Sequence, residues 1–131
     1  MQNKEVSQRQ LRVGQEIKKV IAALIERGEI RNLQELPGVM VTITEARVSP
    51  DLKISNVYFI ARPVEKNDVV LEALQLAANY LRKQVAARTE LRYVPELRFR
   101  VDETYAEVAK IESLLRDPKV ARDLAKKTEE E

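Results

Sequence analysis

The spacing of apolar residues switches between a helical and a strand period along this chain, and this order constrains the fold more than any other feature. In two segments, about residues 13–25 and 71–85, apolar residues recur every three or four positions, as in amphipathic helices. Apolar residues alternate or run continuously, with many β-branched side chains, in segments 39–48, 54–61 and 97–101, as in strands. The order predicts an α+β domain with helices on one face of a three-stranded sheet.

Local signals place the ends of these elements. Ser7 suits the N-cap of the first helix, and Gly28 suits its C-terminal stop. The segment Ser49-Pro50-Asp51 has turn chemistry and predicts an antiparallel hairpin of the first two strands. A change of alternation phase near Glu45 predicts a bulge in the first strand. The pair Asn67-Asp68 offers N-caps for the long second helix.

The alternation of apolar and charged residues in the third strand predicts a sheet with one solvent-exposed face and one buried face. Leu97, Phe99 and Val101 should face the helices, whereas Arg98 and Arg100 should face solvent. A sheet that stacks RNA bases would instead carry exposed aromatic side chains on its strands. We therefore do not expect this strand to form a base-stacking platform.

The end of the chain is predicted to hold one more helix and a tail. Thr104 and Glu107 form a capping-box pattern, and a short apolar stripe lies between residues 108 and 115. Residues 119–131 are mostly polar and end in three consecutive glutamates. We expect a single domain over residues 1–117 and a charged, disordered tail over residues 118–131.

The 131 residues include no Cys and no His, and this excludes several classes of function. Disulfide frameworks, zinc sites and His-dependent nucleophilic catalysis all need these residues. Phosphate-binding glycine loops are excluded because Gly14, Gly28 and Gly38 stand apart. Asp51 and Asp102 are interpreted as a turn residue and a strand-end cap rather than acid–base groups. We expect no catalytic residue, no metal and no cofactor.

No apolar run approaches the roughly 18 residues of a membrane span, and the N-terminus lacks the apolar stretch of an export signal. We therefore expect no membrane partner and a cytoplasmic location.

Clustered positive charge is the strongest sign of a ligand. The net charge is only +2, but residues 1–100 hold 17 basic and 12 acidic residues, whereas residues 101–131 hold 6 and 9. Such asymmetry is typical of a surface that binds a polyanion, and a solvated basic face is the alternative. The candidate contacts are Arg82, Lys83, Arg88 and Arg92 along and beyond the long helix, and Arg9, Arg12, Lys18 and Lys19 on the first helix.

Two further features are interpreted as structural. Tyr58 and Tyr80 are expected to pack in the core and against helices rather than to stack on bases. The turn from Ser49 to Lys53 is expected to stabilise the hairpin, with a role as a contact loop as the alternative.

Seven short stretches carry a family resemblance. They occur in order between about residues 9 and 115: Arg12–Ile17, Val41–Thr44, Val48–Lys53, Asn56–Phe59, Asn79–Arg82, Leu91–Phe99 and Ile111–Leu115. The patterns Ser-x-Asp-Leu-Lys and Leu-Arg-x-x-Pro-x-Leu-x-Phe are the most specific of them. Together these stretches resemble the ribosome-binding factor A family of bacterial small-subunit assembly factors.

The resemblance implies a type II KH-like domain without catalytic activity. Such a protein binds the maturing small (30S) ribosomal subunit and its 16S ribosomal RNA and assists the processing of that RNA. A monomer is expected, with ribosome-maturation GTPases as further partners. With the resemblance included, the basic residues of the two helices are predicted to contact RNA. The alternative is a small protein-interaction adaptor with an α+β fold and no nucleic-acid role.

The resemblance also implies a kink in the long helix. Members of the family have an Ala-x-Gly interruption there, and the corresponding residues are Ala77-Ala78-Asn79. Asn79 stands where the family has Gly, and Asn tolerates a left-handed or distorted backbone better than other non-Gly residues.

Overall fold

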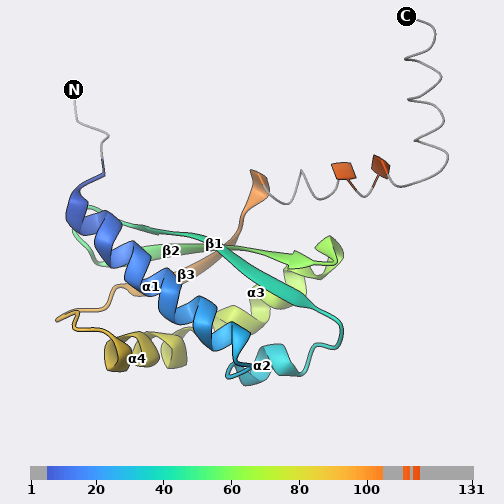
Figure 1. Ribbon diagram of the computed structural model, residues 1–131, viewed down its shortest axis with the longest axis horizontal. Coiled ribbons are helices and arrows are strands. Elements are labelled where there is room, and N and C mark those ends of the chain that lie inside the picture. Colours follow the sequence, from blue (N-terminus) through green and yellow to red (C-terminus); the bar gives the residue numbers. More distant parts are fainter. Residues whose placement is uncertain (1–5, 105–110, 113, 116–131) are drawn as a thin grey trace, which may run out of the picture. The chain divides into compact units, whose positions relative to one another are not determined.

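The computed structural model describes residues 6–104, 111–112 and 114–115. The chain divides into two compact units, residues 1–101 and 102–131, and each is described by itself. The elements of the first unit, labelled in Figure 1 except for the short 3₁₀ helix η1, are α1 (Gln8–Glu26), α2 (Arg31–Gln34), β1 (Met40–Val48), β2 (Ile54–Arg62), η1 (Val64–Lys66), α3 (Asn67–Leu76), α4 (Ala78–Arg88) and β3 (Glu96–Val101).

The three strands form one sheet in the order β1-β2-β3. β1 and β2 pair antiparallel as the predicted hairpin, and β3 runs parallel to β2 because α3 and α4 return the chain to the other end of the sheet. The register shifts between Ile43 and Glu45, which confirms the predicted bulge in the first strand.

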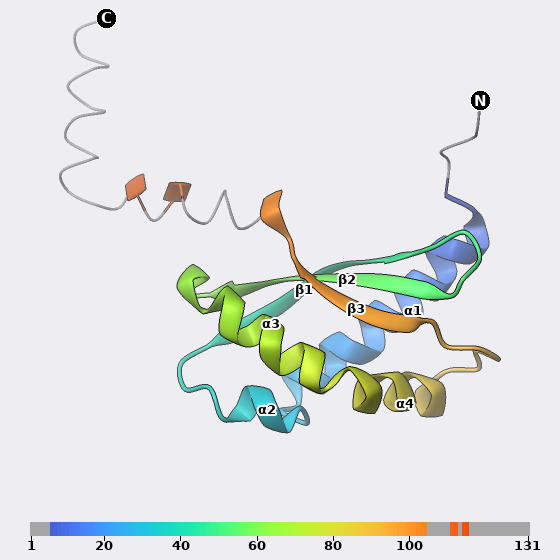
Figure 2. The ribbon, with the colours of Figure 1, turned by 180° about the vertical axis from the view of Figure 1, so that it is seen from behind.

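Figures 1 and 2 show α1, α3 and α4 on the same side of the sheet. α1 packs on β1, and α3 and α4 pack on β3. Leu97 and Phe99 are buried as predicted, and Val101 is half-buried. The core that fills the space between these layers consists mainly of Val13, Ile17, Ile21, Leu24, Ile43, Val57, Phe59, Val70, Leu74, Leu81, Val85, Leu97 and Phe99.

The ends of α1 carry the predicted signals. Ser7 is the N-cap and forms a capping box with Gln10. At the other end, Gly28 has a positive φ of 70°, and the N–H of Glu29 donates to the carbonyl of Leu24 at 2.9 Å. This pattern is a Schellman motif, in which Gly avoids the steric cost of a left-handed residue.

Two local predictions differ from the structure. Asn67 does not cap α3 but is its first residue, and its buried Oδ1 accepts a hydrogen bond from the N–H of Ala61 at 2.7 Å. That bond attaches the start of α3 to β2, so the side chain is used for tertiary contact rather than for its own helix. The sequence between Gly28 and the Pro37-Gly38 pair predicts a loop, but this segment contains the four-residue helix α2.

The prediction of a final helix falls largely outside the described residues. Glu103, Thr104 and the described positions 111–112 and 114–115 are helical. Glu107, Val108 and the predicted tail at residues 118–131 lie outside them, whereas Ile111, Leu114 and Leu115 of the apolar stripe are described and exposed. The predicted domain boundary after residue 117 therefore stays a prediction.

Candidate nucleic-acid interface

One groove brings together cations from both predicted basic sets. Arg9 and Arg12 of α1 and Arg92, from the loop between α4 and β3, line a hollow of about 620 Å³. All three side chains are exposed, and within the described part of the chain none of them has a hydrogen-bond or ion-pair partner. We call this hollow the arginine groove. Its other lining residues are Gln8, Val13, Leu52, Glu90, Leu91 and Tyr93.

The first turn of α1 is attached to the end of β1, which places Arg9 and Arg12 beside the hairpin turn. The Ser7 hydroxyl accepts from the N–H of Gln10 at 3.1 Å, and the Gln10 Oε1 accepts from the N–H of Ser7 at 2.9 Å. The buried Nε2 of Gln10 donates to the carbonyl of Val48 at 2.9 Å. One glutamine thus completes the helix cap and holds the helix on the last residue of β1.

The hairpin turn uses its polar side chains internally. The Asp51 carboxylate accepts from the Ser49 hydroxyl at 2.7 Å and from the N–H of Lys53 at 3.0 Å. These hydrogen bonds, that from Ser49 first, lower the pKa of Asp51. The Ser49 Oγ in turn accepts from the N–H of Ile54 at 3.1 Å. The polar groups of this turn therefore stabilise the hairpin, as the structural interpretation expects.

Leu52 has an unusual backbone conformation beside the groove. Its φ is 62°, and no other non-glycine residue among those described has a positive φ. This region costs an L-residue such as Leu roughly 1–2 kcal/mol. The half-buried side chain packs against the core and lines the arginine groove. A glycine would avoid the backbone cost but would remove this apolar wall.

The opposite wall is a loop held by Arg82. Its Nε donates to the carbonyl of Val94 at 3.0 Å, and its guanidinium lies over the Tyr93 ring, 5.5 Å from the ring centroid. Val94 and Pro95 are buried and anchor the end of the loop, whereas Tyr93 is 56% exposed. Arg82 therefore positions the groove wall through two contacts within the chain.

The remaining predicted cations lie outside the arginine groove. Arg88 donates to Gln84 Oε1 at 3.1 Å and forms an ion pair with Glu29 at 3.5 Å. The Lys18 ammonium donates to the carbonyl of Thr44 at 3.1 Å. Lys19 and Lys83 are exposed, and within the described residues neither has a partner.

The long helix is interrupted where the resemblance implies a kink. α3 ends at Leu76 and α4 begins at Ala78, with Ala77 between them at φ −90° and ψ 0°. Asn79 is inside α4 and does not have a positive φ. The distortion expected at Asn79 is therefore found two residues earlier, at Ala77, a small residue that is only 8% exposed.

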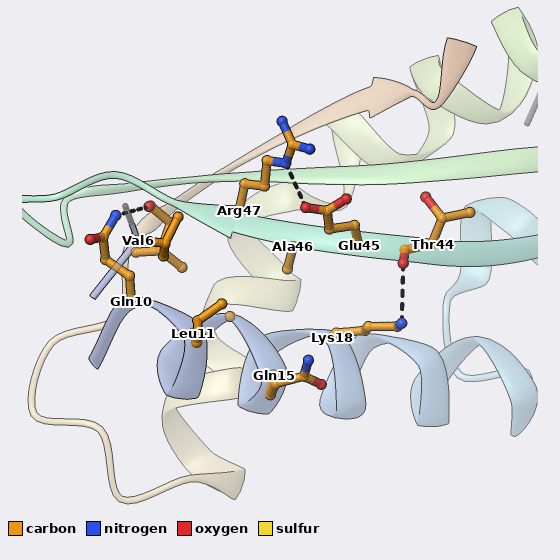
Figure 3. Close-up of a pocket in the computed structure, with 11 residues that line it drawn as sticks. Val6, Gln10, Leu11, Gln15, Lys18, Thr44, Glu45, Ala46 and Arg47 are labelled. Atoms are coloured by element: carbon orange, nitrogen blue, oxygen red, sulfur yellow. Dashed lines mark hydrogen bonds and ion pairs between the residues drawn. The ribbon is translucent and has the colours of Figure 1, made fainter. Parts of the chain in front are cut away.

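A second hollow, of about 530 Å³, lies on another face of α1, between that helix and β1 (Figure 3). Three residues of α1, spaced four apart, meet alternate carbonyls of β1 there. Gln10 donates to the carbonyl of Val48, and Lys18 donates to that of Thr44. Between them Gly14 faces the Ala46 carbonyl, 2.5 Å from where a Cβ would lie. These contacts cover the free edge of β1 with helix α1.

The sheet face away from the core carries charged and aromatic side chains. Tyr58 is half-buried, lies outside the core, and has the Arg47 guanidinium over its ring at 5.7 Å from the centroid. Tyr80 is 42% exposed on α4. Neither tyrosine belongs to the core, so the expectation of core packing is wrong, whereas the preference for packing over base stacking stays a prediction. Arg100 is exposed as predicted and donates to Asn56 Oδ1 at 3.0 Å.

Four residues that sequence reasoning did not assign to a site have clear roles in the structure. Tyr93 and Leu52 line the groove, and Gln10 and Gly14 fit α1 to β1. Tyr93 could have been suspected because it directly follows Arg92, and aromatic residues interleaved with arginines are typical of RNA-binding surfaces.

Among the described residues there is no cluster of three carboxylate side chains that could hold a metal ion, and no helix has the length and apolar character of a membrane span.

Comparison with known proteins shows close relatives over most of the chain. The chain is 42% identical over 124 residues to ribosome-binding factor A of Bradyrhizobium sp. (strain ORS 278), covering 95% of this chain and 89% of that protein. It is 45% identical over 118 residues to ribosome-binding factor A of Afipia carboxidovorans, covering 90% of this chain and 83% of that protein.

Solved structures agree with the fold. The crystal structure of ribosome-binding factor A from Thermus thermophilus aligns with a TM-score of 0.58 at 25% identity, over 70% of this chain and 94% of that chain. A homology model of the Thermus thermophilus factor, fitted into a cryo-electron microscopy map of its 30S complex, aligns with a TM-score of 0.55 at 26% identity, over 66% of this chain and 88% of that chain. These structures confirm the predicted α+β, KH-like fold.

The family model described as ribosome-binding factor A matches residues 9–115, a span that includes nearly every element of the fold and the whole predicted set of motif stretches. The resemblance is thereby confirmed, and this chain belongs to the ribosome-binding factor A family.

Proposed function

We propose that this chain is a non-catalytic assembly factor that binds the maturing small ribosomal subunit through its 16S ribosomal RNA and assists the processing of that RNA. Membership of the family supports this function, as does the relative fitted into a 30S complex. We further expect a cytoplasmic monomer that cooperates with ribosome-maturation GTPases. The observation that carries the proposal is the arginine groove.

The arginine groove has the chemistry of a phosphate-binding surface. Arg9 and Arg12 lie about one turn apart on α1, and Arg92 approaches from the opposite wall. Guanidinium groups bind phosphate oxygens through paired N–H donors and stay charged at any physiological pH. Because all three lack partners within the described residues, they can bind phosphates without first breaking an ion pair to any of those residues. Such contacts supply much of the affinity for RNA.

The other predicted cations have different roles in this proposal. Lys19 and Lys83 are exposed and extend the positive surface beyond the groove. Arg82 acts mainly through the loop that it positions. Arg88 and Lys18 are partly engaged within the chain, so each would have to exchange or share a partner to contact RNA.

The experiment is the salt dependence of binding to purified small ribosomal subunits. The parent should show log K falling with log salt, because each neutralised phosphate contributes a slope of roughly 0.7–0.9. A triple variant with Arg9→Gln, Arg12→Gln and Arg92→Gln should bind more weakly, and its slope should be shallower by about 2–3. Its thermal unfolding should match the parent, since the three side chains are exposed and unpaired within the described residues.

The control removes three exposed cations that do not line the groove, through Arg27→Gln, Arg31→Gln and Lys66→Gln, of which Arg27 and Arg31 form exposed ion pairs with Glu29 and Glu35. Its affinity and slope should stay close to those of the parent. Equal slopes for the two triple variants would place the binding surface elsewhere. A nearly flat slope for the parent would contradict RNA binding and favour the protein-interaction adaptor.

A further inference from the structure

Tyr93 is the feature of the arginine groove that phosphate binding does not explain. It is 56% exposed in a groove whose cations alone would suffice for phosphates. In RNA-binding proteins, exposed aromatic rings beside cations commonly stack on unpaired bases.

The Tyr93 ring is fixed in position by Arg82. The Arg82 guanidinium lies over the ring at 5.5 Å from its centroid, and Arg82 is itself fixed by its 3.0 Å hydrogen bond to the Val94 carbonyl. Tyr93 is still more than half exposed with Arg82 over its ring, which leaves accessible ring surface for a base. A ring fixed in this way loses little conformational freedom when a base stacks on it.

Apolar side chains line the groove near the ring. Leu52 and Leu91 are half-buried and line the same hollow. Leu52 keeps its place there despite the positive φ of 62°, a conformation that Gly would adopt without steric cost. A wall of leucines favours the flat, poorly hydrated faces of a base over a second phosphate.

The rim supplies polar groups for both ends of a nucleotide. Arg9, Arg12 and Arg92 are placed for the phosphates, while Gln8 and Glu90 offer hydrogen-bonding groups that can meet a base edge. The volume of about 620 Å³ falls within the roughly 300–1,000 Å³ of sites for small ligands. The excess of guanidinium over carboxylate in the lining fits an anionic ligand rather than a basic peptide or an apolar helix.

We propose that the arginine groove binds one unpaired nucleotide of the RNA, with its base stacked on Tyr93 and its flanking phosphates at Arg9, Arg12 and Arg92. This inference rests on the proposed function and specifies it, because it requires a single-stranded or bulged position in the bound RNA. A rigid duplex keeps its bases stacked on one another and cannot present one to Tyr93.

The test compares a single-stranded RNA decamer, the same decamer with abasic positions, and a duplex of equal length, each binding to the full chain. The parent should bind the base-bearing strand more tightly than the abasic strand. Tyr93→Leu, which keeps an apolar side chain, should weaken binding of the base-bearing strand by about 5- to 150-fold. The same change should leave the abasic strand and the duplex within about 2-fold, since phosphate contacts do not involve the ring.

Two control variants isolate the ring. Tyr93→Phe keeps the stacking surface and should bind within about 2-fold of the parent. Tyr80→Leu removes an exposed tyrosine of α4 that does not line the groove and should have no effect. The inference is overturned if the parent binds abasic and base-bearing strands equally, a result that needs no variant, or if Tyr93→Leu weakens the duplex as much as the single strand.

These outcomes are separable from a failure of the proposed function. If the inference alone fails, the parent still binds small subunits with a steep salt slope that depends on the three arginines. If the proposed function fails, the parent shows a flat salt slope with subunits and binds neither strand nor duplex, and the base-stacking site fails with it. If the chain binds a protein of the subunit tightly and has no affinity for any of the RNAs, the proposed function and the base-stacking site are both contradicted.

Discussion

The α-carbon of Gly14 lies so close to the carbonyl oxygen of Ala46 that a Cβ on residue 14 would be 2.5 Å from that oxygen. The contact is the middle one of three along the α1–β1 interface, between the Gln10–Val48 and Lys18–Thr44 hydrogen bonds. Four residues of a helix span about 6 Å along its axis, and two residues of a strand span about 6.6 Å. Every fourth residue of α1 therefore stays opposite every second carbonyl of β1 over this length. The absence of a side chain at residue 14 therefore lets the two flanking bonds form.

We predict that Gly14→Ala destabilises the fold although Ala is the better helix former. Helix propensity alone would favour Ala by about 1 kcal/mol. The new methyl group would collide with backbone, which cannot rotate away, so helix and strand must separate, at a typical overpacking cost of about 1–3 kcal/mol. Urea unfolding should show a net loss of stability. Gln15→Ala, at the exposed neighbouring position, is the control and should change stability by less than about 0.5 kcal/mol.

Gly14 shows why part of this interface could not be predicted. An isolated glycine in a helical pattern has no sequence signal that distinguishes a close approach from a tolerated defect. The same holds for Gln10, which resembles any polar residue of a first turn but is 8% exposed and bonds to β1. Both roles depend on which strand packs beside the helix, and this is determined by the tertiary structure rather than by the local sequence.

The alternation in β3 gives a second prediction. Phe99 is 4% exposed within the core, and Arg98 next to it is exposed. Phe99→Ala should cost about 3–5 kcal/mol of the free energy of unfolding, because it removes buried surface and leaves a cavity. Arg98→Ala should cost less than about 1 kcal/mol, since its ion pair with Glu96 is exposed. Comparable unfolding midpoints for the two variants would contradict the assignment of Phe99 to the buried face of β3 and of Arg98 to the exposed face.

The fold was predictable where one face of an element is apolar over several residues. Leu97 and Phe99 and the bulge near Glu45 follow from such local patterns. Sequence reasoning failed where a polar side chain had two possible partners. Asn67 could cap α3 or bond β2, and the buried N–H of Ala61 decides between them.

The sequence indicated which cations could form the candidate site but not which of them share one groove. Arg12 and Arg92 are far apart in the sequence, and they share a groove because the loop before β3 folds against the hairpin turn. That loop is held by Arg82, which as a sequence feature is indistinguishable from Lys83. Charge clustering thus identified the candidate surface, whereas side-chain hydrogen bonds determine which cations are available on it.

The hairpin turn gives a pH-dependent prediction. The Asp51 pKa is lowered from its usual 3.8, first by the Ser49 hydroxyl and then by the N–H of Lys53. A carboxyl with a lower pKa in the folded state contributes stability at pH values above 3.8 and loses it as the pH falls through the lowered pKa. Asp51→Asn should therefore lower the Tm at pH 7, and the difference from the parent should be lost in a second measurement at a pH below the lowered pKa.

The matched control for the turn is Glu72→Gln, an exposed carboxylate of α3 without a hydrogen-bond partner among the described residues. Its Tm should follow the parent at both pH values. If Asp51→Asn unfolds at the parent's Tm at pH 7, the charge of Asp51 does not strengthen the turn.

Arg82 and Lys83 are adjacent on α4 but should respond differently to loss of charge. Lys83 is exposed and has no partner within the described residues, so Lys83→Gln should reduce the salt slope of subunit binding by roughly 0.7–0.9 and leave Tm unchanged. Arg82→Gln removes the bond to the Val94 carbonyl and the cover on the Tyr93 ring. It should cost about 1–2 kcal/mol of stability and loosen the groove wall.

Measuring RNA binding and unfolding on the same variants shows whether Arg82→Gln removes a phosphate contact or the contacts that hold the loop. Because the loop carries both Arg92 and Tyr93, Arg82→Gln should weaken RNA binding even at high salt, where a lost phosphate contact has little effect. Lys83→Gln should converge with the parent at high salt, because its contribution is electrostatic alone. If Arg82→Gln also converges with the parent at high salt and keeps the parent's Tm, Arg82 is a simple phosphate contact and does not position the groove.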